Sequence, residues 1–135
     1  MDRINKMLAA GEPAVLSIFR VVTALLLFQY GVAKLLKFPA IPMFEKVQVL
    51  SLYGTAAMFE FVFGGLLILG LFSRLAAFIL CGEMAFAYFI GHFPRGFIPI
   101  QNGGSLAIML SFACLFLDCA GGGPWSLDAM LRKKG

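Results

Sequence analysis

Hydrophobic residues occur in four long segments that glycine, proline and charged residues separate. The segments cover residues 14–36, 52–72, 75–92 and 103–120, and each is close to the roughly 20 residues with which a helix crosses a bilayer. Helix-breaking residues lie between and after the segments: Pro39, Pro42, Pro94, Pro99 and the glycine run 121–123. The pattern predicts an all-α membrane protein with four transmembrane helices in an antiparallel bundle. We expect these helices to form one domain over residues 1–135.

Composition supports burial of these segments in lipid. Hydrophobic residues make up 61% of the 135-residue chain and charged residues 13%, whereas a soluble domain carries about 25% charged residues. A soluble domain of this size could not hide so much apolar surface. The net charge of +4 is not carried by a basic helix with interleaved aromatic residues. We therefore expect a lipid bilayer and no nucleic acid as a partner.

The distribution of basic residues predicts the orientation. An even number of spans places both termini on one side, and the positive-inside rule places the more basic side in the cytoplasm. That side would hold Arg3, Lys6, Arg74, Arg132, Lys133 and Lys134. The other side would hold Lys34, Lys37, Lys46 and Arg95. The difference is modest and predicts cytoplasmic termini.

The cysteines and the histidine do not form a metal-binding or dithiol pattern. Cys81, Cys114 and Cys119 form no CxxC pair, and His92 is the single histidine of the chain. We therefore predict no metal site, and we interpret the cysteines as small packing residues.

Charged residues inside the segments share helical faces with small residues. On the first segment, Arg20 lies on one face with Ala24, Leu27, Gly31 and Lys34. On the second, Glu60 lies with Tyr53, Ala56, Gly64, Leu67 and Leu71. On the fourth, Asp118 lies with Gly104, Ala107, Ser111 and either Cys114 or Leu115. Small residues allow close helix packing in membranes, so these faces are predicted to be buried in the bundle.

Two glutamates, Glu60 and Glu83, are the leading candidates for chemistry. Counting about 1.5 Å per residue places both near the bilayer midplane, and Arg20 and Asp118 in the cytoplasmic half. Arg20 could pair with Asp118 or reach a central carboxylate, while Lys34 could extend to the outer interface. One arginine neutralises at most one glutamate, so the other is expected to hold a proton and could serve proton-coupled chemistry. The alternative is a pair of glutamates held in packing hydrogen bonds.

Several stretches of the chain resemble the DoxX family of small bacterial membrane proteins with four spans. They read YGVAKL (30–35), EFVFGGLLILGLFSRLAA (60–77), GEMAFAYFIGHFPRGFIPIQNGG (82–104) and GGPWSLDA (122–129). The resemblance covers most of the chain in the family's order. Two places depart from it: many members have a glutamate after the Asn-Gly-Gly turn where this chain has Ser105, and many have a histidine before the glycine of the first segment where this chain has Gln29-Tyr30.

The resemblance implies a location in the bacterial inner membrane and a link to quinone-dependent oxidoreductases. We therefore predict a membrane subunit that binds a quinone or a similar lipophilic ligand and supports a redox partner. Glu60 and Glu83 are the catalytic candidates. The predicted ligand-binding residues are Arg20, Tyr30, Lys34, Glu60, Glu83, Tyr88, His92 and Asn102. The alternatives are a proton-coupled transporter, which would need a homo-oligomer, and a non-catalytic scaffold for a redox partner.

Overall fold

The computed structural model describes residues 2–36 and 52–134, and every regular element among them is a helix. The longer helices are α2 (Glu12–Leu35), α3 (Leu52–Leu69), α4 (Ser73–Ala87) and α6 (Ser105–Ala120). The shorter ones are α1 (Asp2–Ala10), α5 (Pro99–Asn102) and α7 (Leu127–Lys134). A π-helical turn (Tyr88–His92) and a 3-10 turn (Phe93–Arg95) continue α4. The predicted all-α class is confirmed for these residues.

The longer helices lie within or close to the four hydrophobic segments of the sequence. The predicted proline-broken loop after the first segment, with Pro39 and Pro42, lies outside the described residues. Helices α1 and α7 do not follow from the hydrophobic segments, because both are short and carry charged residues on one face. The structure therefore adds a short amphipathic helix before the first segment and another after the last.

Two stretches of the described chain are long and apolar enough to cross a membrane. They are Glu12–Leu35, which is α2, and Ser73–Arg95, which is α4 with its two continuing turns. The apolar part of α3, Gly54–Leu69, and the apolar helix α6, Ser105–Ala120, are shorter. Sixteen helical residues extend about 24 Å, compared with about 30 Å of hydrocarbon in a typical bilayer.

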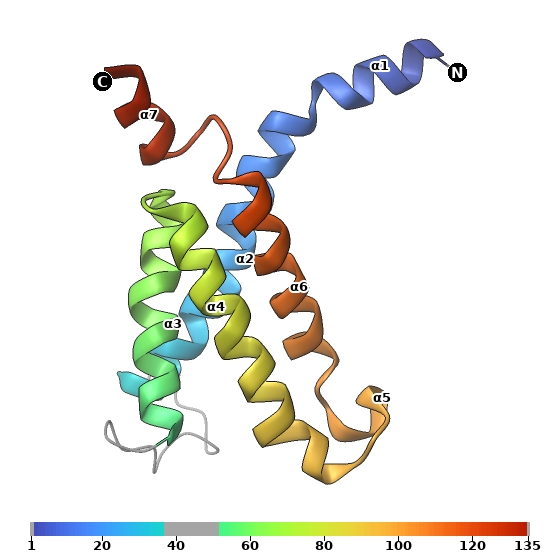
Figure 1. The fold of residues 1–135 in the computed structure, drawn as a ribbon, viewed down its shortest axis with the longest axis vertical. Helices are drawn as coiled ribbons and strands as arrows, with labels where there is room; N and C mark the ends of the chain where they lie inside the picture. Colours follow the sequence, from blue (N-terminus) through green and yellow to red (C-terminus); the bar gives the residue numbers. More distant parts are fainter. Residues whose placement is uncertain (1, 37–51, 135) are drawn as a thin grey trace.

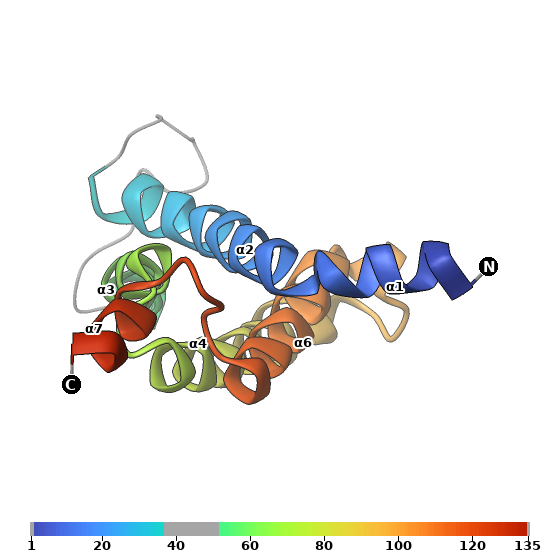
Figure 2. The ribbon, with the colours of Figure 1, turned by 90° about the horizontal axis from the view of Figure 1, so that it is seen from above.

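The longer helices pack as two pairs along a common long axis. Helix α2 packs against α3 and α4 against α6, while α3 and α4 join the pairs through a short turn. Figure 1 shows α1, α7 and the α3–α4 turn at one end of the molecule and α5 at the other. The view from above shows the two pairs side by side (Figure 2).

Small residues bring the backbones of α2 and α3 together. A Cβ added at Gly31 would lie 2.7 Å from the backbone nitrogen of Phe61 and 3.0 Å from the carbonyl oxygen of Ala57. One added at Gly64 would lie 3.3 Å from the Phe28 backbone. The predicted small-residue faces of the first and second segments therefore meet each other.

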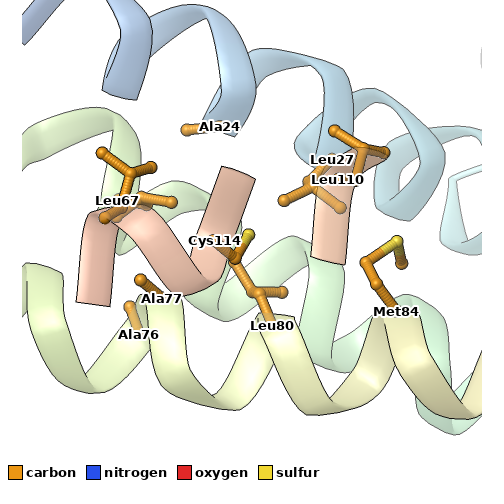
Figure 3. Close-up of a cluster of buried hydrophobic side chains, with 10 residues drawn as sticks. Ala24, Leu27, Leu67, Ala76, Ala77, Leu80, Met84, Leu110 and Cys114 are labelled. Atoms are coloured by element: carbon orange, nitrogen blue, oxygen red, sulfur yellow. The ribbon is translucent and has the colours of Figure 1, made fainter. Parts of the chain in front are cut away.

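A buried apolar cluster holds the two helix pairs together (Figure 3). It contains Ala24, Leu27, Leu67, Ala76, Ala77, Leu80, Met84, Leu110, Cys114 and Leu117. Cys114, not Leu115, faces this core from α6. Beside it the Ser111 hydroxyl donates to the Cys81 carbonyl at 3.0 Å, which links α6 to α4. Cys81 and Cys114 thus act as packing residues, whereas Cys119 is exposed.

The C-terminal segment fixes the turn between α3 and α4. This turn needs a left-handed backbone at Gly70, where φ is 73°, and at Phe72, where φ is 52°. The Asp128 carboxylate accepts hydrogen bonds from the backbone nitrogens of Phe72 at 2.9 Å and Ser73 at 2.8 Å, and so caps α4. Burial would raise the pKa of Asp128, but the donors from Ser73 and Phe72 hold it below its ordinary value.

We expect Gly31→Ala to lower the free energy of unfolding in detergent by about 1–3 kcal/mol, because its Cβ would meet the backbone of α3. Gly82→Ala is the matched control, since no atom lies within 4 Å of a Cβ placed there. It should be neutral or stabilise α4 by about 0.5–1 kcal/mol. Equal stabilities of the two variants in a denaturation series would contradict close α2–α3 packing.

Candidate functional site

Three charged side chains from three helices meet inside the described structure. Lys34 comes from the last turn of α2, Glu60 from the middle of α3 and Glu83 from α4. The Lys34 ammonium donates to both carboxylate oxygens of Glu60, at 3.2 and 3.3 Å. The side chains of Lys34 and Glu60 are only 11% and 2% exposed. This ion pair is thus shielded from water, and breaking it would leave a buried charge.

Glu83 completes the group through its contact with Glu60. The two carboxyl groups lie close enough for a hydrogen bond between them when one of them holds a proton. Such a bond needs a proton on one of the two groups, because two carboxylates have acceptors only. With one shared proton, the charges of Lys34 and the glutamate pair cancel. We call these three residues the Lys–Glu–Glu cluster.

One polar atom of the cluster has no partner in the described part of the chain. Glu83 Oε2 is buried and makes no hydrogen bond there. Buried polar atoms are nearly always hydrogen-bonded in folded proteins, and one left alone costs about 1–3 kcal/mol. This oxygen is therefore the position at which the cluster can accept or donate a further hydrogen bond.

Tyr30 lies beside the cluster on α2. The Lys34 ammonium is 5.7 Å from the centroid of the Tyr30 ring, within the range of a cation–π contact. The ring thus shields one side of the ammonium. The structure brings together Tyr30, Lys34, Glu60 and Glu83 among the predicted ligand-binding residues.

Tyr88, His92 and Asn102 form a second group, which lies between the C-terminal end of α4 and the short helix α5. The Asn102 amide nitrogen donates to the Tyr88 hydroxyl at 3.2 Å and to the Gly96 carbonyl at 2.9 Å, and its amide oxygen accepts from Gly104 at 2.8 Å. His92 Nδ1 lies 3.1 Å from the Asn102 carbonyl oxygen. Asn102 is 2% exposed, so its side chain is committed to holding the α4–α6 connection.

The π-helical turn Tyr88–His92 carries two residues of the second group. Tyr88 follows Glu83 by five residues, or about 7.5 Å along a helix. A π-helical turn widens the helix by one residue and often lies next to functional positions. Here it directs the Tyr88 ring toward Asn102 and the adjoining Gly104. The second group therefore borders the Lys–Glu–Glu cluster without joining it.

The predicted role of Arg20 in the cluster is wrong. Arg20 lies 14 residues before Lys34 on α2, about 21 Å along the helix. Its guanidinium donates to the carbonyl oxygens of Gly122, Ile68 and Trp125. It forms no ion pair with Asp118, so this expected pair is also wrong. Arg20 instead binds the C-terminal segment to α2 and α3.

The expectation that Lys34 extends to the outer interface is wrong as well. Helical side chains lean toward the N-terminus of their helix. On α2 this direction takes Lys34 back toward the middle of the molecule, where it meets Glu60. The same direction takes Arg20 away from the glutamates and toward Trp125. Lys34 therefore takes the pairing with a glutamate that depth alone offered to Arg20.

A model of the DoxX family matches residues 15–93, which include most of α2 and all of α3, α4 and the π-helical turn. The chain belongs to the DoxX family. A Haemophilus influenzae protein described as "Uncharacterized protein" is 41% identical over 137 residues, covering 91% of this chain and 95% of that protein. No solved structure matches the chain. The DoxX match spans all three residues of the Lys–Glu–Glu cluster.

Polar residues after the matched range have structural roles. Asn102 holds the connection before α6, and Asp128 caps α4. Ser105 is exposed at the start of α6. No group of three or more metal-ligating side chains occurs among residues 2–36 and 52–134.

The Lys34–Glu60 ion pair can be measured with a double-mutant cycle. We expect Lys34→Met and Glu60→Gln to be coupled by about 1–3 kcal/mol in unfolding free energy, because each single change leaves the other group buried without its partner. Lys34→Met combined with Asp118→Asn is the control, and those effects should add within about 0.5 kcal/mol. Additive effects of the first pair would show that the ion pair is not formed.

Proposed function

We propose that this DoxX protein is an integral membrane protein in which α2, α3, α4 and α6 all cross the bacterial inner membrane. Large apolar side chains point outward along these helices, including Val22, Phe78, Met109 and Phe112, each at least 50% exposed. Such surfaces are unusual on a monomer in water and suit contact with lipid. Both termini lie at one end in Figure 1, as an even number of spans requires, and we assign that end to the cytoplasm.

Within this membrane protein, we propose that the Lys–Glu–Glu cluster binds a lipophilic carbonyl compound such as a quinone. The observation that carries the proposal is Glu83 Oε2, a buried oxygen without a hydrogen-bond partner in the described part of the chain, on a carboxyl group next to Glu60. When the ligand binds, the proton would leave the contact with Glu60 and lie on Glu83 Oε2, which would then donate to the ligand's carbonyl oxygen. Because the cluster is buried among apolar helices, its ligand must itself be largely apolar.

The residues of the cluster would have distinct roles. Glu83 would donate its hydrogen bond, or its proton, to the ligand's oxygen. Glu60 would exchange that proton with Glu83 through their mutual hydrogen bond. Lys34 would stabilise the negative charge that remains on the carboxyl pair after the proton leaves. A quinone that gains electrons also gains protons, and the electrons would come from a redox partner protein.

The cluster should be tested with a short-chain quinone titrated into purified protein in detergent. We expect Glu83→Met to weaken binding about 10- to 100-fold, because the hydrogen bond from a buried, polarised carboxyl is lost. Glu83→Gln can still donate a hydrogen bond but cannot release a proton, so it should keep part of the affinity and lose its pH dependence. Asp118→Asn removes an acid of α6 outside the cluster and is the control.

Unchanged affinity in Glu83→Met and Glu60→Gln would contradict the site. Proton uptake into liposomes that depends on Glu83, without quinone binding, would favour a transporter. Tolerance of glutamine at both positions, together with co-purification of an oxidoreductase, would favour a scaffold.

A further inference from the structure

Helix α1 is an amphipathic helix, and no other element among residues 2–36 and 52–134 covers its apolar face. All nine of its residues, Asp2–Ala10, are exposed. Ile4, Met7 and Leu8 are 57%, 70% and 70% exposed. At about 100° per residue these three side chains lie within about 100° of arc on the helix. Figures 1 and 2 show α1 extending away from the other helices.

The polar residues of α1 are arranged around this apolar face. Arg3 lies on its flank next to Met7, and Asp2 and Lys6 lie on the opposite side. This arrangement places a cation at the boundary of the apolar face and another on the outer side. A helix with this pattern fits the boundary between lipid acyl chains and headgroups, where basic residues meet lipid phosphates.

The apolar face of α1 continues the exposed apolar face of α2. The spacing from Ile4 and Leu8 leads through Gly11 to Val15, Ile18 and Val22 on α2. Val15, Ile18 and Val22 are 61%, 51% and 50% exposed. The lipid proposed to surround α2 would therefore also contact the apolar face of α1.

Length gives a second reason to expect a contact for α1. Isolated helices shorter than about 12–15 residues are marginal in water. Helix α1 has nine residues, and among the described residues no other element buries any of them. A surface that covers Ile4, Met7 and Leu8 would stabilise it.

The same end of the molecule carries other groups suited to a membrane surface. Trp125, the single tryptophan of the chain, is 63% exposed there, and tryptophan is enriched at membrane interfaces. Helix α7 exposes Met130 and Leu131, and its last turns are basic and include Arg132. Figure 1 places α1 and α7 at this same end.

We propose that α1 lies in the headgroup layer of an anionic leaflet, with Ile4, Met7 and Leu8 in the acyl region and Arg3 and Lys6 near lipid phosphates. The inference rests on the membrane insertion proposed above. It assigns to residues 2–10 a lipid-binding surface distinct from the Lys–Glu–Glu cluster. The preferred lipid is identified by its negative charge.

The test places an environment-sensitive fluorophore on single added cysteines in the full chain, with the exposed Cys119 changed to serine. The positions are Ile4→Cys on the apolar face, Ala9→Cys about 140° away on the same helix, and Val22→Cys on α2. The signal of the chain without an added cysteine is subtracted. The protein is reconstituted into phosphatidylcholine vesicles with and without phosphatidylglycerol, each containing a lipid-borne quencher.

We expect the label at Ile4 to be quenched at least threefold more than the label at Ala9, and more in vesicles that contain phosphatidylglycerol. Arg3→Gln with Lys6→Gln in the Ile4→Cys chain should remove the difference between the two vesicle types. Equal quenching at Ile4 and Ala9, with strong quenching at Val22, would overturn the α1 inference and leave membrane insertion intact. Absence of quenching at Val22 would overturn both. Equal quenching of the Ile4 label in vesicles with and without phosphatidylglycerol would contradict the preference for anionic lipid.

Discussion

The structure depends on neutralising ionised side chains inside a set of apolar helices. A carboxylate in such surroundings is costly unless a cation or a proton offsets its charge. Lys34 offsets Glu60, and we propose that a proton shared with Glu83 offsets the remaining acid. This requirement fixes α2, α3 and α4 relative to one another, because the three side chains come one from each helix. Gly31 permits the close α2–α3 approach that brings Lys34 to Glu60.

The opposite end of the same helices is held by a different kind of interaction. Arg20 donates to backbone carbonyls of the C-terminal segment, and Asp128 caps α4 at the turn after Gly70. These contacts join residues more than 50 positions apart in sequence without an ion pair between them. The hydrogen bonds of Arg20 and Asp128 therefore hold one end of the bundle, and the buried Lys–Glu–Glu cluster lies nearer the other end. The contacts that hold the helix ends therefore involve none of the three residues of the cluster.

Helical periodicity identified the buried faces of Glu60 and Gly64 from sequence, and counting depth placed Glu60 and Glu83 at a similar level. Depth counting offered Arg20 rather than Lys34 as the partner of a glutamate. The reason is that depth was counted at the backbone, whereas a long side chain reaches several ångströms toward the N-terminus of its helix. The cap at Asp128 could not be predicted, since it joins two segments that are distant in sequence. Hydrophobicity also missed α1, whose nine residues mix charged and apolar positions. Sequence thus indicated which residues are buried, and side-chain direction decided which of them meet.

The proton shared by Glu60 and Glu83 is the central claim, and infrared difference spectroscopy tests it most directly. Protonated and ionised carboxyl groups absorb at separate positions in the infrared spectrum. We predict a protonated carboxyl band in the purified protein at neutral pH. The band should be lost or displaced in Glu83→Gln and unchanged in Asp118→Asn. A spectrum that shows only ionised carboxylates at neutral pH would contradict a shared proton, and with it the proposed proton-linked site.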